Sequence, residues 1–286
     1  MECVFACEID KHARTTYESN FTVLSPALFS NGNFATDITK VDAATIPDFD
    51  ILCAGFPCQA FSSAGLRKGF SDPRGQLFYE IIRILEAKIP KAFIIENVRN
   101  LLSHDNRKTF VTMLNALKEA GYHVQYKVLK ACDFGLPQFR PRVYIVGFRE
   151  NIPFTFPNPI PLQSTMSDIL KGTCEKQIGY TILASHGGKS FGHKRCWDAY
   201  KVDGIVRRIS VPEAKKMMGF PDSFKFPVSD IQAMRQLGNA VAVPAVEALA
   251  VELVKALELM ALSTSQNIPC TSSLPLRGFQ AGDFAQ

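Results

Sequence analysis

The stretches ILCAGFPCQ (residues 51–59) and AFIIEN (residues 92–97) decide the fold of this chain. Each is an apolar run of strand length that ends in polar or reactive side chains, Pro-Cys-Gln in the first and Glu-Asn in the second. Between them, apolar residues over positions 77–85 recur at the spacing of one helix face. A strand, a helix and a second strand in this order predict a parallel βαβ unit.

The same alternation of short apolar runs and amphipathic stretches extends over residues 1–150. We expect helices leading to Tyr17 and over residues 110–120, and further strands at residues 3–9, 124–129 and 143–148. This pattern predicts an α/β protein with a doubly wound parallel sheet. Because the carboxyl ends of parallel strands meet at one edge of such a sheet, the polar ends of the first two stretches are expected to share a site.

The rest of the chain divides by composition. Residues 151–162 contain four prolines and are expected to leave the sheet as a linker into a small, irregular region over residues 151–206. An apolar helix from Pro244 is expected to pack back onto the sheet, so that residues 207–262 rejoin the first domain. Residues 263–286 are rich in Ser, Thr, Pro and Gly and are expected to form a disordered tail.

Composition excludes several protein classes. With 286 residues, 47% hydrophobic and 21% charged, the chain can bury a core, which excludes a disordered or fibrous protein. The most apolar stretch, residues 240–262, is interrupted by a proline and four charges, so no membrane helix is expected. The net charge of +5 is compatible with a polyanionic partner but does not require one.

The cysteines and the N-terminus favour a cytoplasmic protein. The eight cysteines are scattered without a Cys-x-x-Cys pair, which indicates reduced thiols, and five dispersed histidines do not build a metal site. Glu2 stands where an export signal would be basic, so no such signal is visible.

Cys58 lies in the turn GFPCQAFSSAG (residues 55–65), which is rich in glycine and small polar residues. One interpretation is a thiol that fills the core. The other is a nucleophile that faces a cleft, with its pKa lowered by nearby cations. Arg140 and Arg142 of the QFRPR segment could supply that charge.

Glu96 ends the apolar run of the second stretch. Burial of a carboxylate costs several kcal/mol unless the group is paired or protonated. Glu96 is therefore expected either to pair with an arginine or to have a raised pKa and share a proton with a substrate.

Five blocks carry a family resemblance, in this order along the chain: GFPCQAFS (55–62), IIENVRN (94–100), QFRPRVYIVGFR (138–149), RRISVPEAKKMMGFPDSF (207–224) and QLGNAVAVP (236–244). Together they resemble the DNA cytosine-5 methyltransferases of bacterial restriction-modification systems. The resemblance covers residues 2–258 and implies a Rossmann-like methyltransferase sheet with a small target-recognition domain.

The resemblance also implies a mechanism. Cys58 would attack C6 of a cytosine flipped out of the duplex, and Glu96 would bond N3 and the exocyclic amine. Arg140 and Arg142 would contact the base and a nearby phosphate. The methyl group would come from S-adenosylmethionine.

By the same resemblance, Glu8 would bind the cofactor ribose, although by itself it could equally be a surface acid. The other cofactor contacts would be Ile9, Asp37, Ile38, Phe56, Pro57, Leu77 and Asn239. Gln59, Ser62 and Arg74 are candidates for DNA contact, and Arg74 is equally well explained as an exposed turn residue.

The stretch over residues 185–208 is basic and carries interleaved aromatic residues. Such a stretch suits contact with DNA phosphates, and the family resemblance implies that Lys189, Lys194 and Arg195 contact duplex DNA. Without the resemblance, a solvated surface strip is the favoured interpretation.

The chain departs from the family pattern at its start. Met1 falls where the second strand of the family begins, and the Gly-rich block that receives the methionine end of the cofactor is missing. A start codon assigned too late, a partner chain that supplies the piece, or a decayed gene would each account for this. The further partner expected for the family is a cognate restriction endonuclease.

Three competing functions therefore stay open: a DNA-binding remnant without cofactor, a tRNA methyltransferase of the related eukaryotic-type branch, and a cysteine hydrolase. The hydrolase lacks an evident histidine beside Cys58.

Overall fold

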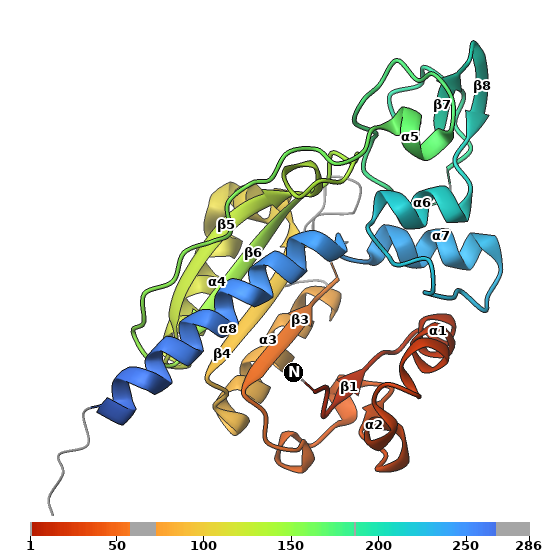
Figure 1. Ribbon diagram of the computed structural model, residues 1–286. Helices are drawn as coiled ribbons and strands as arrows, with labels where there is room; N and C mark the ends of the chain where they lie inside the picture. The colour runs from red at the N-terminus through yellow and green to blue at the C-terminus, as the bar shows by residue number, and fades with distance from the viewer. Residues whose placement is uncertain (1, 58–72, 186, 267–286) are drawn as a thin grey trace, which may run out of the picture.

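The computed structural model describes residues 2–57, 73–185 and 187–266 (Figure 1). Its main sheet has four strands in the order β3-β4-β6-β5. They are β3 (Ile51–Gly55), β4 (Ala92–Val98), β5 (His123–Lys130) and β6 (Pro141–Phe148). All four were expected from the sequence, but β4 is longer than its apolar run, so that Glu96 and Asn97 lie within the strand.

The direction of β6 corrects the prediction of a wholly parallel sheet. β3 and β4 are parallel, whereas β6 runs antiparallel to both β4 and β5. The chain passes from β5 to β6 through the short helix η6 (Ala131–Asp133) and a loop. Parallel neighbours need a crossover of a dozen or more residues, which this connection does not provide.

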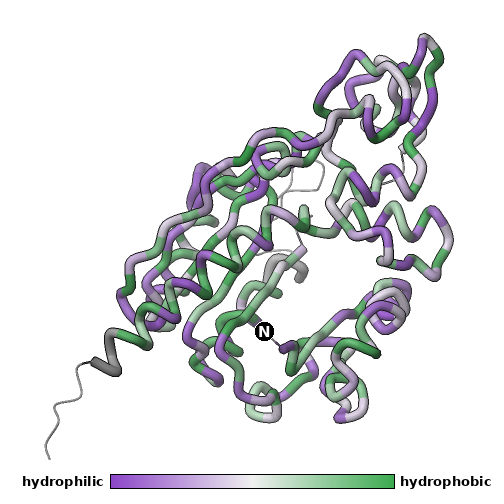
Figure 2. The backbone as a smooth tube through the Cα atoms, viewed as in Figure 1, coloured by the Kyte–Doolittle hydropathy of each residue, from purple (hydrophilic) through white to green (hydrophobic). Residues whose placement is uncertain are grey.

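Helices cover both faces of the sheet. Helix α3 (Pro73–Lys88) and helix α4 (Lys108–Glu119) pack on one face, where their apolar residues meet Phe93 and Ile95 of β4. Helix η5 (Arg99–Arg107) connects β4 to α4. The long helix α8 (Val243–Gln266) packs on the other face through residues that include Leu249 and Leu253. The prediction that this helix returns to the sheet is confirmed, and Figure 2 shows its alternating hydrophobic and hydrophilic residues.

The N-terminal residues form a separate layer of structure. Strands β1 (Ala6–Cys7) and β2 (Phe34–Ala35) pair with each other in parallel, and in the described part of the chain neither pairs with the main sheet. Phe5 and Leu52 pack into one small core with Ile46 and Ile84, which joins this layer to β3 and α3. The remaining elements here are helices α1 (Lys11–Phe21), α2 (Pro26–Ser30), η1 (Ile38–Lys40) and η2 (Ala43–Thr45).

A second contact joins the N-terminal layer to the far end of the chain. The side-chain amide of Asn20 in α1 donates to the carbonyl of Lys225 at 2.8 Å, and its oxygen accepts from the Lys225 amide at 2.8 Å. The rings of Phe21 and Phe224 pack edge to face beside these bonds.

The remaining residues form a small unit with its own core. It contains helices α5 (Met166–Leu170), α6 (Val211–Met217) and α7 (Asp230–Asn239) and the hairpin of β7 (Ala199–Val202) with β8 (Ile205–Arg208). Trp197, Tyr200, Met217 and Leu237 share one buried cluster. The packing therefore crosses the expected boundary at residue 206, because β8 spans it and α6 and α7 bury their apolar faces against the same core.

No helix among the described residues is both long enough and apolar enough to cross a membrane.

Candidate active site

Glu96 and Arg142 form an ion pair at one end of the main sheet. Glu96 lies opposite Tyr144 in the antiparallel pairing of β4 with β6, so Arg142, two residues earlier on β6, is its diagonal neighbour on the same face. Arg142 Nε lies 2.9 Å from Glu96 Oε1, and the two side chains are only 12% and 18% exposed. The sequence left open whether Glu96 pairs with an arginine or is a buried acid with a raised pKa. In the structure it is both buried and paired with Arg142.

The pKa of Glu96 is raised above its ordinary value because burial disfavours the charged form; Arg142 and then Arg140 oppose this shift. Glu96 Oε1 meets no donor at hydrogen-bonding geometry among the described residues, although it is ion paired. A buried carboxyl group of this kind keeps its proton to a higher pH than an exposed one. It can also accept a hydrogen bond from a ligand.

Asn97 connects this strand end to the segment just before Cys58. Its side chain is 2% exposed, and Nδ2 donates to the Phe56 carbonyl at 3.1 Å while Oδ1 accepts from the Val98 amide at 2.8 Å. Cys58 lies outside the described residues. Through its bond to Phe56, Asn97 thus fixes the backbone two residues before Cys58. Sequence reasoning noticed the polar Glu-Asn pair but assigned no role to Asn97, although an amide within a buried run was the available signal.

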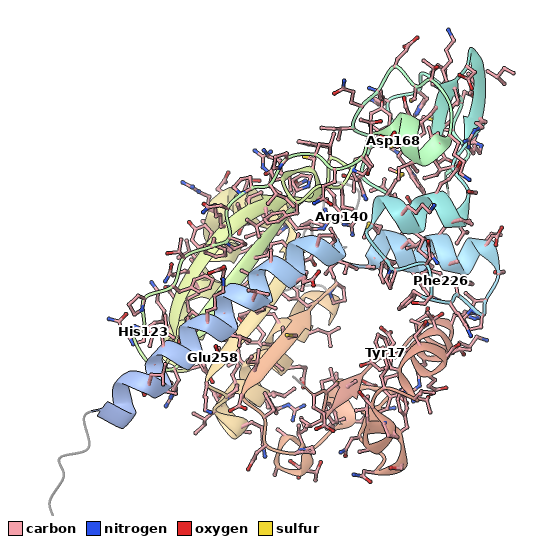
Figure 3. The ribbon with its side chains drawn as sticks, viewed as in Figure 1. Tyr17, His123, Arg140, Asp168, Phe226 and Glu258 are labelled. Carbon is pink, nitrogen blue, oxygen red and sulfur yellow. The ribbon has the colours of Figure 1, made fainter. Side chains whose placement is uncertain are left out.

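Arg140 occupies a different position from the one expected of a base-contacting residue. It is 2% exposed, and its guanidinium donates to three main-chain carbonyls: Ile182 at 3.0 Å, Gly238 at 2.9 Å and Ala240 at 2.5 Å. Figure 3 shows Arg140 where the sheet, the start of α8 and the small unit meet.

Gln138 was missed by sequence reasoning. It is fully buried, and Nε2 donates to the Met217 carbonyl at 3.0 Å while Oε1 accepts from the Ile182 amide at 3.0 Å. Its place in QFRPR was the only signal, because burial of a glutamine cannot be read from composition.

Four of the expected cofactor contacts lie just beyond the carboxyl ends of β1 and β2. Glu8 follows β1, and its carboxylate accepts from the Asp10 amide at 2.8 Å; Ile9 beside it is 69% exposed. Asp37 follows β2, and bonds from Thr39, with a smaller effect of Lys40, hold its pKa below the ordinary value. Ile38 is the next residue, at the start of η1. Glu8 and Asp37 therefore place two carboxylates at the carboxyl edge of parallel strands, where they can accept hydrogen bonds from the hydroxyls and amines of a ligand.

The other expected cofactor contacts come from three further elements. Phe56 and Pro57 follow β3, and Phe56 is buried edge to face against Phe78. Leu77 lies on α3 and packs against the same core. Asn239 is the last residue of α7 and is exposed. Residues on or just after β1, β2, β3, α3 and α7 thus supply acidic, apolar and amide groups of the kinds that can bind a nucleoside.

The expected DNA contacts are only partly described. Gln59 and Ser62 lie outside the described residues, and Arg74 lies in the first turn of α3. Lys189, Lys194 and Arg195 are exposed on the loop before β7.

Two residues hold this loop in place. Asp198 accepts from the Gly188 amide at 3.1 Å and pairs with Arg208, which also donates to the Lys189 carbonyl at 3.1 Å. Three exposed cations are thereby presented on an anchored loop. Among the residues that the structure describes, no group of His, Cys, Asp or Glu side chains is arranged to hold a metal ion.

Comparison with known proteins adds independent information. The family model described as "C-5 cytosine-specific DNA methylase" matches residues 1–189 and 181–255. The chain is similar to the type II methyltransferase M.NlaX of Neisseria lactamica, with 43% identity over 90% of each chain. It is similar to the type II methyltransferase M.HhaI of Haemophilus parahaemolyticus, with 36% identity over 87% of this chain and 86% of that protein.

Solved structures share the fold. The S. pombe Dnmt2 methyltransferase superposes with a TM-score of 0.68 at 18% identity, covering 91% of this chain and 92% of that one. A Spodoptera frugiperda DNMT2 mutant gives a TM-score of 0.64 at 20% identity, covering 90% and 92%.

Proposed function

The chain belongs to the C-5 cytosine-specific DNA methylase family, and from that premise we propose that it methylates C5 of a cytosine within a specific duplex sequence, as the methyltransferase of a restriction-modification system. The observation that carries this proposal is the buried Glu96–Arg142 pair at the strand end, with Asn97 bonded to the turn that leads to Cys58.

In the proposed reaction, the target cytosine leaves the helical stack and the Cys58 thiolate adds to C6. Glu96 shares its proton with N3 and accepts from the exocyclic amine, which stabilises the ring while C5 becomes nucleophilic. The raised pKa of Glu96 suits this role, because burial favours the protonated form of the carboxyl group. Arg142 holds the Glu96 carboxyl in place and contacts the substrate. Once C5 carries the methyl group, loss of the C5 proton to water and cleavage of the bond between C6 and the Cys58 sulfur restore the aromatic ring.

S-adenosylmethionine, when bound, supplies the methyl group. We propose that Glu8 holds the ribose hydroxyls and that Asp37 and Ile38 hold the adenine, with Ile9, Phe56, Pro57, Leu77 and Asn239 around them. The positions of Glu8 and Asp37 beyond two adjacent parallel strands support this assignment.

The exposed loop before β7 is proposed to read the target. Lys189, Lys194 and Arg195 would contact phosphates. Gln59, Ser62 and Arg74, from the region after Cys58, would contact the DNA where the target base has left the stack. Anchoring by Asp198 and Arg208 supports this role, because a fixed loop loses less conformational entropy on binding.

The test is transfer of labelled methyl from S-adenosylmethionine to mixed-sequence duplex DNA, followed by bisulfite sequencing of the product. We expect methylation at one short sequence, and its loss in Cys58→Ser. Full activity of Cys58→Ser would contradict the proposal. Transfer to tRNA in place of DNA would favour an RNA methyltransferase.

A second candidate is a DNA-binding protein that needs a complementing chain to hold the cofactor. It is favoured because the strands β1 and β2 form a sheet separate from the main one. β1 and β3 each have one edge that no described strand pairs with, and Cys53 on β3 is exposed. A strand from a partner would bridge these edges. Calorimetric titration decides between the two, because tight binding of S-adenosylmethionine to the isolated chain removes the second candidate.

A further inference from the structure

We infer that Arg140 is a positioning residue that couples the target-recognition unit to the catalytic strand end, and that it makes no contact with DNA. This inference rests on the proposed function and adds a role that the family resemblance does not give. The coupling would make methyl transfer depend on how the small unit sits against the sheet.

The guanidinium bonds tie three segments of the chain together. Ile182 belongs to the small unit and contributes to its buried core. The carbonyls of Gly238 and Ala240 flank Asn239, the proposed cofactor contact at the end of α7. Arg140 itself immediately precedes β6, which presents Arg142 to Glu96. One side chain, on the residue just before the catalytic strand β6, therefore contacts both the recognition unit and the cofactor side.

The chemistry of these acceptors explains why an arginine is buried here. Carbonyls at the C-terminus of a helix carry partial negative charge, and a cation placed there is stabilised. A planar guanidinium can donate to acceptors in several directions at once, whereas a lysine ammonium acts as a point charge on a flexible stem.

Gln138, two residues before Arg140, adds further bonds between the segment that leads into β6 and the small unit. Its side chain bonds Ile182 and Met217. Backbone bonds from Phe139 to Gly179 at 2.9 Å and from Gly179 to Pro137 at 2.9 Å run beside it. The end of α7 also lies close to the segment that follows Ile182, because a Cβ atom on Gly238 would lie 2.2 Å from the Ala184 amide nitrogen.

Arg140→Lys is the variant to test. The three donors of an ammonium all lie on one nitrogen, so lysine cannot reproduce the spread of the two guanidinium nitrogens that reach the three carbonyls, and the small unit should pack less firmly against the sheet. We expect kcat to fall about tenfold or more, and a larger share of methylated cytosines to lie outside the wild-type sequence by bisulfite sequencing.

The matched control is Arg149→Lys. Arg149 also donates to main-chain carbonyls, those of Ala120 at 2.9 Å and Gly121 at 3.3 Å, but it follows the opposite end of β6. Its replacement should lower stability without changing kcat or the methylated sequence.

Salt dependence separates positioning from DNA contact. Each phosphate contact contributes about 0.9 to the slope of log affinity against log salt for duplex DNA. Because lysine would keep the charge, this test uses Arg140→Gln, for which we expect the same slope as for the wild type. A slope reduced by about one would overturn the inference and make Arg140 a phosphate contact.

Hydrogen exchange of the unliganded chain tests the coupling without activity. Amides over residues 179–184 should exchange about tenfold faster in Arg140→Lys, while those of β5 stay unchanged. Unchanged exchange with unchanged kcat would overturn the inference. If the wild-type chain itself transfers no methyl group, the proposed function fails for the isolated chain, and the exchange result still decides the role of Arg140.

If Arg140→Lys does not fold, Gln138→Met replaces it in the same measurements. This variant keeps the volume of the side chain and loses the bonds to Ile182 and Met217. Normal kcat, sequence choice and exchange in Gln138→Met would then overturn the inference.

Discussion

Glu96 is a largely buried carboxyl group that is ion paired with Arg142 and has a raised pKa. Glu96→Gln keeps the size and removes the titrating proton. We expect methyl transfer to fall about 10²–10⁴-fold, the usual contribution of a positioned acid or base. Steady-state rates at neutral pH measure this, with Glu80→Gln on α3 as the control because Glu80 pairs with Arg83 on the same helix. Activity within threefold of the wild type, in a folded variant, would remove Glu96 from the mechanism.

The raised pKa of Glu96 also predicts how stability changes with pH. Below the ordinary carboxyl pKa both the folded and the unfolded state hold the proton, so Glu96 contributes nothing pH-dependent there. As pH rises from that value to the higher pKa of the folded state, the unfolded state releases its proton first. The stability of the wild type relative to Glu96→Gln should therefore fall over this window, measured by urea unfolding at a series of pH values. A relative stability that rises with pH would contradict the shift.

Asn97 is expected to matter for both stability and activity. Asn97→Ala leaves the buried Phe56 carbonyl without this donor, which predicts a loss of about 1–3 kcal/mol in the free energy of unfolding. It should also lower kcat, because the backbone before Cys58 is no longer fixed. Asn100→Ala, at an exposed position nearby, is the control and should change neither quantity.

At the scale of elements, the start of α6 is held by a capping box. Ser210 and Glu213 bond each other reciprocally, and Arg207 pairs with both oxygens of Glu213 at 2.7 and 3.0 Å. Burial opposes the shift, but the bonds from Arg207 and Ser210 lower the pKa of Glu213. Glu213→Gln should cost about 1 kcal/mol at neutral pH.

The pH dependence of this cost follows from the lowered pKa. The stabilisation by Glu213 is fully present above the ordinary glutamate pKa and is lost as pH falls through the lower pKa of the folded state. The difference between the wild type and Glu213→Gln should therefore shrink in acid. Glu247→Gln on the exposed side of α8 should show no such trend.

At the scale of the whole molecule, the two-part sheet predicts unequal protection. β1 and β2 are two residues long and half-buried, whereas β6 is paired on both sides and buried over most of its length. Backbone amides at Ala6–Cys7 and Phe34–Ala35 should exchange well before those of β6. Exchange mass spectrometry of the isolated chain measures this. Equal protection in both places would mean that the N-terminal layer unfolds only with the rest of the molecule.

How much of this could be read from the sequence differs between residues. The strands β3 and β4 and the helix α3 were predictable, because period and turn residues are local signals. The direction of β6 was not, because it depends on which strands pair. The acid Glu96 and its arginine partner were foreseeable from chemistry, whereas the burial of Arg140 and Gln138 depends on segments about 40 to 100 residues away.

The pair of hydrogen bonds between Asn20 and Lys225 has a consequence for the order in which contacts form during synthesis. The two residues are 205 positions apart, so a ribosome adding about 5–20 residues per second needs on the order of 10–40 seconds to make the second after the first. Throughout that interval α1 has no C-terminal partner to hold it. Helix α1 therefore gains its hydrogen bonds to Lys225 only after most of the chain between them has been made.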